Sequence, residues 1–246
     1  MTCWASQAGG CWGEQSGEHL FSRCLFEHRA VTLKGLPWCR HEYKTIGIES
    51  LTSNILCHGH NGELSPVDSG AKLVWDSFRN IDELHNLRKK LRPRVWSTKH
   101  WQVSGLLFER WFLKTTINLL CSVGKEGPWS LSGPPSSFPP VEFVAVAFGR
   151  ASLLKPRGLY MSARIGDQHT TEDSVTWEVL EDPGGYPVGA SFKFRGFPFL
   201  LWLHSVDPGK NPSPLENLSG YAGVQQIYHP LRVKIADSYQ CLDFGW

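Results

Sequence analysis

The placement of cysteine and histidine in the first 60 residues constrains this chain more than any other feature. Cys57 and His60 form a close pair with two residues between them, and Cys3 and Cys11 form a second, wider pair. A structural zinc ion takes four thiolate or imidazole ligands, commonly supplied as two pairs. The sequence therefore predicts a zinc site formed by Cys3, Cys11, Cys57 and His60.

The spacing between Cys3 and Cys11 is wide for a zinc pair, so other ligands remain open. The alternatives are Cys24, Cys39, His41 and His58. Cys57 and His60 could also be ordinary buried side chains, but the density of Cys and His in this stretch favours the metal.

Composition is consistent with a metal-stabilised cytoplasmic protein. The 246 residues suffice for one large domain or two small ones, and 41% apolar and 20% charged residues are typical of a globular protein. We expect no membrane span and no export signal, because the chain has neither a long apolar run nor a basic, then apolar, leader. In a reducing compartment, seven cysteines with five before residue 58 favour metal ligands or buried thiols over disulfides.

We expect an α+β fold in three parts. Residues 1–80 have little apolar periodicity and would need the metal for stability. They end in a helix over about 67–78, beginning near Ser65 or Asp68. The apolar stripe of this helix is Ala71, Leu73, Val74 and Phe78.

Residues 81–126 hold a charged segment, 82–91, and a helix over 105–123. This helix is apolar nearly all round, which predicts a central, buried position. A Pro-rich and Ser-rich linker follows over 127–140.

Residues 141–246 contain short runs of β-branched and aromatic residues between Gly, Pro and Asp turns. The predicted strands are 141–148, 158–165, 174–180, 189–195, 197–204 and 231–235. We expect them to form an antiparallel sheet packed on the 105–123 helix.

The densest basic run follows the first predicted helix. It consists of Arg88, Lys89, Lys90, Arg92 and Arg94. Because the net charge is only +2, any basic surface must be local. The run predicts a phosphate-binding patch beside the metal module, or else an ordinary solvated face.

An acidic residue and a histidine, Glu18-His19, precede Cys57-x-x-His60-Asn61 at a helix start. This order resembles the HNH or ββα-metal nucleases, and specifically the zinc-stapled, endonuclease VII-like branch. The stretches 17–22, 35–39, 54–57, 60–61, 64–68 and 108–115 also resemble a group of bacterial HNH-like proteins. The resemblance implies a treble-clef-like module over residues 1–80.

The resemblance also implies residue roles. Glu18 and Asn61 would hold Mg²⁺ or Mn²⁺, and His19 would be the general base that activates water. Asn54 is an alternative for the asparagine that orients the base. A cation and a base are what phosphodiester hydrolysis needs.

Two departures from the family pattern favour other roles. Glu18 stands where Asp is commoner, and the last histidine of the full pattern is missing, so Asn61 must replace it. Glu18 could instead be a capping carboxylate, and His19 a zinc ligand or a residue that supports one.

These observations predict a metal-dependent HNH-type endonuclease that cuts DNA rather than RNA, with a role in defence against phage or mobile DNA. The alternative is a non-catalytic zinc-binding module that recognises nucleic acid or a protein. A regulatory protein or small ligand acting through residues 141–246, and a homodimer, are further expectations.

Overall fold

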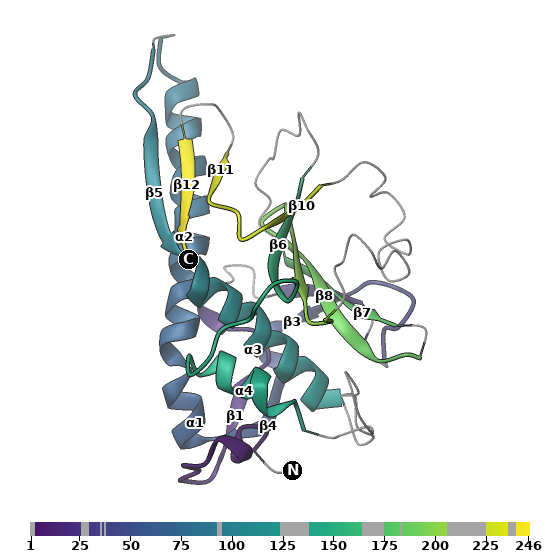
Figure 1. The fold of residues 1–246 in the computed structure, drawn as a ribbon. Helices are drawn as coiled ribbons and strands as arrows, with labels where there is room; N and C mark the ends of the chain where they lie inside the picture. The colour runs from purple at the N-terminus through teal and green to yellow at the C-terminus, as the bar shows by residue number, and fades with distance from the viewer. Residues whose placement is uncertain are drawn as a thin grey trace.

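One long helix connects the two ends of the molecule. The computed structural model describes residues 3–25, 30–34, 36, 38–92, 95–123, 138–163, 175–182, 184–205, 225–235 and 240–246. Helix α2 (Ser65–Lys89) follows α1 (His58–Glu63) almost directly. Its 25 residues correspond to roughly 37 Å at about 1.5 Å per residue. In Figure 1, α1 lies at one end of the molecule and the far end of α2 projects beyond the body at the other.

The expected break in this helix does not exist. Residues 79–81 contain neither Pro nor Gly, so nothing separates the predicted 67–78 helix from the charged segment after it. The predicted apolar stripe of this helix was also partly wrong, because Leu73 is 62% exposed. The buried positions are Val67, Gly70, Ala71, Val74, Trp75, Phe78 and Ile81.

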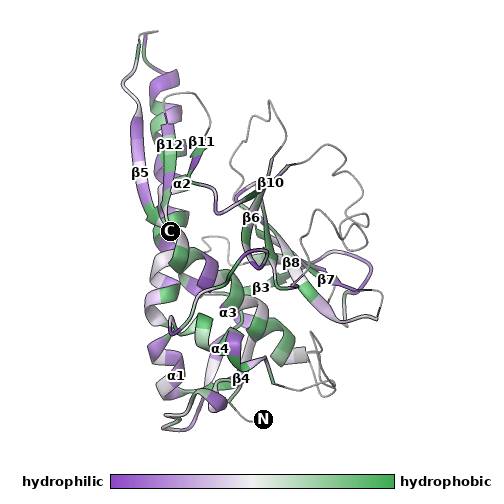
Figure 2. Ribbon diagram, in the orientation of Figure 1, coloured by the Kyte–Doolittle hydropathy of each residue, from purple (hydrophilic) through white to green (hydrophobic). Residues whose placement is uncertain are grey.

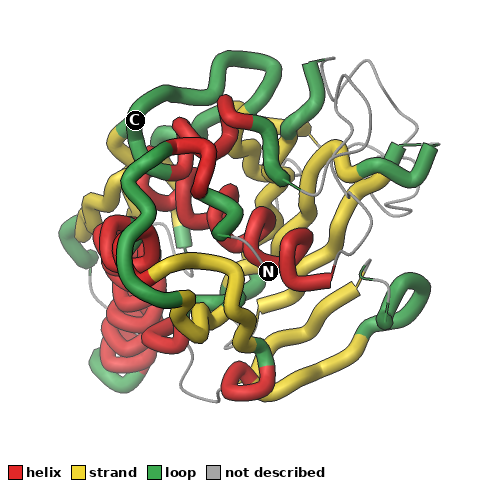
Figure 3. Tube along the Cα trace, turned by 90° about the horizontal axis from the view of Figure 1, so that it is seen from below, coloured by secondary structure: helices red, strands yellow, loops and turns green. Residues whose placement is uncertain are grey.

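Helix α3 (Gly105–Val123) confirms the predicted central helix. Every residue from Trp111 to Leu120 is buried. Its aromatic residues pack on the larger sheet, with the Phe112 and Phe192 ring centroids 4.1 Å apart. Seen from below, the helices lie to one side of the strands of this sheet (Figure 3).

The larger sheet has seven described strands in the order β10-β6-β9-β8-β7-β2-β3. Their bounds are β2 Ala30–Lys34, β3 Lys44–Gly47, β6 Gly158–Ala163, β7 Val175–Glu181, β8 Pro187–Phe194, β9 Phe197–Trp202 and β10 Gln225–Tyr228. The expectation of an antiparallel sheet made by residues 141–246 alone was wrong. Strands β2 and β3 come from the N-terminal part, and β2 pairs with β7 in parallel.

The predicted strand over 141–148 is a helix, α4 (Val141–Ala147). Its buried residues are Phe143, Val144, Val146 and Ala147, a helical spacing. Pro140 precedes the helix in an extended conformation. A short Val-rich run fits either structure, and here packing on α3 overrides β propensity.

A separate sheet of three described strands stands beside the far end of α2. It consists of β5 (Lys99–Ser104), β11 (Arg232–Lys234) and β12 (Gln240–Gly245), with β12 parallel to β5. One buried cluster runs from Cys3 to Phe244, so the three predicted parts share one core.

Candidate metal centre and the buried network beside it

The predicted zinc ligands come together. The Sγ atoms of Cys3, Cys11 and Cys57 and a ring nitrogen of His60 lie within 4.8 Å of one another. His60 Nδ1 is 3.3 Å from Cys3 Sγ, 3.5 Å from Cys11 Sγ and 3.3 Å from Cys57 Sγ. Zn–S and Zn–N bonds of about 2.3 and 2.1 Å place such atoms roughly 3.6 Å apart in a tetrahedron, so the set fits zinc.

A hairpin and its following helix position these ligands. Strands β1 (Gln15–His19) and β4 (Thr52–Cys57) pair antiparallel, with Gln15 opposite Cys57. Cys57 ends β4 and precedes α1, which carries His60 one turn later. The Trp4 backbone N–H donates to the carbonyl of Ile55, which holds Cys3 beside β4.

The backbone of residues 12–14 is hydrogen-bonded to the start of α1. The backbone N–H of His58 donates to the carbonyl of Glu14, and that of Gly59 donates to the carbonyl of Trp12. A Cβ atom on Gly59 would lie 2.3 Å from Nε1 of the Trp12 indole, so this approach requires glycine. The contact keeps Cys11 close to Cys57.

The orientation of His60 matches a metal ligand. Its Nε2 lies 2.9 Å from the carbonyl oxygen of Gly9, which can only accept a hydrogen bond. The ring proton is therefore on Nε2, and the lone pair of Nδ1 faces the three sulfurs. Zinc-binding histidines are commonly held by such a hydrogen bond on the second nitrogen.

The three thiols differ in acidity. Burial raises the pKa of Cys3 to about 12. Burial also raises the pKa of Cys11. Burial opposes ionisation of Cys57, but hydrogen bonds with the backbone of His60 and Trp12 and with the other two thiols lower its pKa to about 6. Of the three thiols, Cys57 therefore ionises most readily.

The alternative ligands lie outside this cluster, whose members among the described residues are the four predicted ones. The alternatives are Cys24, Cys39, His41 and His58. All seven cysteines lie in the described residues, and none of them forms a disulfide.

Glu18, the predicted Mg²⁺ ligand, belongs to a buried ion-pair network. Its Oε1 lies 2.7 Å from Nζ of Lys114 on α3, and Nδ2 of Asn118 donates to it at 3.4 Å. The side chains of Glu18 and Lys114 are 7% and 2% exposed. The carboxylate is therefore already neutralised by an ammonium group.

Asp68 of α2 completes this network. Lys114 Nζ donates to both of its carboxylate oxygens, at 2.8 and 2.7 Å. Asp68 also accepts a short hydrogen bond from Ser22 Oγ, which accepts one from Trp111 Nε1 at 2.8 Å. Burial lowers the pKa of Lys114, but Asp68 and Glu18 outweigh it and raise the pKa overall.

His19, the predicted general base, lies apart from this network. Its Nε2 is buried and without a hydrogen-bond partner, 3.7 Å from Oε2 of Glu49. Glu49 is also paired with Arg23 at 3.1 Å. His19 lies opposite Thr52 at the end of β1, beyond a register irregularity between Ser16 and Glu18.

Asn61 bonds to the near end of β1, where its Nδ2 donates to Ser16 Oγ at 3.0 Å. Asn54, the alternative asparagine, is exposed on β4. The structure thus places Asn61 beside Ser16, Glu18 beside Lys114, and His19 beside Glu49. The three side chains contact different partners.

The basic run was predicted to lie beside the metal centre, but the structure places it elsewhere. Because α2 is continuous, Arg88 and Lys89 lie at the end of the helix opposite to α1. The Arg88 guanidinium stacks over the Trp96 ring, with its Cζ 5.2 Å from the ring centroid, while Lys89, Lys90 and Arg92 are exposed. Arg94 lies outside the described residues.

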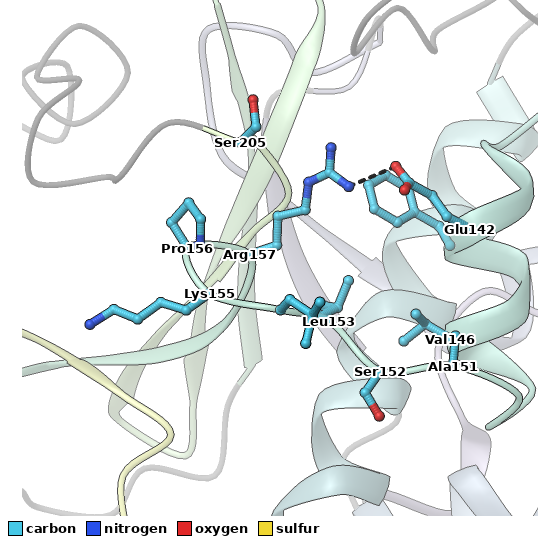
Figure 4. A pocket seen from close by; sticks show the side chains of 11 residues that line it. Glu142, Val146, Ala151, Ser152, Leu153, Lys155, Pro156, Arg157 and Ser205 are labelled. Atoms are coloured by element: carbon cyan, nitrogen blue, oxygen red, sulfur yellow. Dashed lines mark hydrogen bonds and ion pairs between the residues drawn. The ribbon is translucent and has the colours of Figure 1, made fainter.

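A pocket of about 430 Å³ lies between α4 and residues 151–157. Glu142 and Arg157 form an ion pair of 2.7 Å at its edge, and Lys155 extends away from them (Figure 4). The remaining lining is largely apolar, including Phe143 and Leu153. A regulatory ligand of the C-terminal region stays a prediction.

Sequence reasoning missed Lys114, Asp68 and Asn118 as parts of the site. The signal was present, because a lysine within an apolar, fully buried helix needs a buried counter-ion. The two partners that satisfy it, Asp68 and Glu18, are 46 and 96 positions away in the sequence.

Comparison of the chain with models of known protein families, with curated proteins and with solved structures gave no match in any of the three. None of the helices in the described ranges is long and apolar enough to cross a membrane. The assignment of function therefore depends on the geometry above.

Proposed function

We propose that this chain is a zinc-stapled nucleic-acid-binding protein in which the HNH-like hairpin is a scaffold and not a hydrolytic centre. One observation carries the binding: residues 84–104 contain six Lys and Arg residues and no Asp or Glu. Much of this stretch projects from the body of the molecule as the end of α2 and β5, and β5 is largely coloured as hydrophilic (Figure 2). Lys89, Lys90 and Lys99 are exposed. A local, projecting cationic surface attracts phosphates even when the net charge is small.

The hairpin and α1 support the structural half of the proposal. Two antiparallel strands, a helix and four converging zinc donors occur in the order of a treble-clef-like, ββα-metal module. Zinc would fix the N-terminal segment to the start of α1, and would supply stability that this Gly-rich segment lacks. Glu18 supports a scaffold role because Lys114 already provides its counter-charge.

The test of binding is a salt series. Fluorescence anisotropy with zinc-loaded protein and labelled duplex DNA, duplex RNA and single strands would report affinity between about 50 and 200 mM salt. We expect affinity to fall linearly on a log–log plot. Absence of binding at the lowest salt, or binding that does not depend on salt, would contradict the proposal.

A second candidate is the HNH-type endonuclease. It is favoured by the adjacency of Glu18 and His19 on β1 and by the bond between Asn61 and Ser16 of the same strand. Hydrolysis would require Lys114 to release Glu18 to a divalent cation. Cleavage of plasmid or branched DNA with Mg²⁺ or Mn²⁺, lost in both Glu18→Gln and His19→Ala, would establish this function; intact DNA would favour the scaffold.

A further inference from the structure

The projecting end of the molecule is an arm made from three distant parts of the sequence. We use the term arm for residues 84–92, 95–104, 232–234 and 240–245. Strand β12 pairs with β5 from Gln240 opposite Lys99 to Gly245 opposite Ser104, and β11 pairs with β12. The buried Gln240 donates from Nε2 to the carbonyl of Ile81, which ties the sheet to α2 at 3.0 Å.

The small sheet adds two cations, Arg232 and Lys234, that the basic run in the sequence does not contain. Lys234 lies opposite Cys241, which lies opposite His100, so strand alternation places Lys234, Arg232 and His100 on one face. All three are exposed. The acidic residue among them, Asp243, contacts Arg232 Nε at 2.5 Å and His100 Nδ1 at 2.7 Å.

The tip of the arm is apolar as well as basic. Leu87 and Leu91, one helical turn apart, are 56% and 42% exposed, and Val95 is 89% exposed. Lys90 and Arg92 flank Leu91. A purely electrostatic contact with phosphates would leave apolar side chains at the tip without an apolar surface to pack on.

Base steps do offer such a surface. Proteins that bend duplexes place apolar wedges between base pairs from the minor groove while neighbouring Arg and Lys residues hold the phosphates. The arm has both components: Leu91 and Val95 at the tip, and cations behind them on α2, β5 and β11. A lipid surface would engage the tip alone, whereas cations along the side of the arm match a rod-shaped polyanion.

We propose, building on the function above, that the arm binds duplex nucleic acid and inserts Leu91 and Val95 between base pairs, which unstacks and bends the duplex. The cations of α2, β5 and β11 hold the two backbones on either side. Binding then depends on the cations, and deformation depends on the two apolar residues. The two contributions are separable by mutation.

The test uses the zinc-loaded full chain and a duplex DNA that carries 2-aminopurine, with a donor–acceptor pair at its ends. We expect binding to increase 2-aminopurine fluorescence and to shorten the end-to-end distance. The double variant Leu91→Ser, Val95→Ser should keep salt-dependent binding but lose both signals, since its phosphate contacts remain. Both residues are exposed, so the fold should survive.

The matched control is Leu154→Ser, a leucine that is 78% exposed beside the pocket and outside the arm. It should behave as the wild type. Binding without fluorescence or distance change would overturn the wedge and leave the binding function standing. Failure to bind duplex, with retention on vesicles of anionic phospholipid or self-association through the tip, would overturn both.

Discussion

The Lys114 ammonium lies 2.7 Å from the Glu18 carboxylate, and both side chains are buried. The same ammonium bonds to both carboxylate oxygens of Asp68. From its place in the sequence, Glu18 was expected to hold a divalent cation. Here the cation is the ammonium group of Lys114 on α3. Its charge explains how the carboxylates of Glu18 and Asp68 can remain close together.

Replacement of Lys114 by Met should destabilise the protein by about 3–5 kcal/mol, because it leaves buried carboxylates without a counter-charge. Glu18→Gln in the same chain should restore part of the loss, with a coupling of about 1–3 kcal/mol. Urea unfolding of the two single variants and the double variant measures both quantities. Lys72→Met is the control, since Lys72 forms a partly exposed pair with Asp76 whose loss costs little. A Lys114→Met protein as stable as the wild type would refute the network.

The network should remain intact across the physiological pH range. Folding raises the pKa of Lys114. The stability that its ammonium group contributes is therefore fully present below the unfolded pKa of about 10.5 and is lost as pH rises through the folded pKa. The difference in unfolding free energy between wild type and Lys114→Met should therefore be constant from pH 7 to about 9.5 and shrink above about 10.5. A difference that shrinks already between pH 7 and 9 would contradict this.

The metal centre should hold one zinc ion per chain. His60→Ala and Cys57→Ala should lose the metal and lower the unfolding temperature, whereas the control Cys24→Ser should keep it, because Cys24 lies outside the cluster. Elemental analysis together with calorimetry measures both effects. Retention of a full zinc equivalent by His60→Ala would place the metal elsewhere.

The arm cations should determine the salt dependence of nucleic-acid binding. Lys89→Ala with Lys90→Ala should reduce the log–log salt slope by about 2, at roughly 0.9 per phosphate contact. The matched control is Lys193→Ala, an exposed lysine of β8 in the larger sheet. An unchanged slope in the double variant would mean that the phosphates are bound elsewhere.

Local chemistry made part of this structure predictable. The four residues of the candidate metal centre could be predicted because few residue types bind zinc and because the Cys57–His60 spacing is typical of a ligand pair. Helix α3 was predicted with its observed bounds, because its apolar residues extend round the whole helix. Both features depend on residues close together in the sequence, or on rare side chains.

What escaped prediction depends on long-range pairing. The parallel pairing of β12 with β5 joins residues about 140 positions apart, and no periodicity in either strand shows it. The Val-rich 141–147 segment is helical because of what it packs against. The ion pair between Glu18 and Lys114 could not be predicted, because Lys114 lies on a helix whose orientation the sequence does not reveal.

Titration of zinc-loaded protein with Mn²⁺, followed by electron paramagnetic resonance, tests most directly whether the hairpin is a scaffold. With Lys114 as the counter-ion of Glu18, we predict no stoichiometric Mn²⁺ site that depends on residue 18, so wild type and Glu18→Gln should give the same free-Mn²⁺ signal. One tightly bound Mn²⁺ per chain that disappears in both Glu18→Gln and Asn61→Ala would contradict the account and restore a catalytic cation to the site.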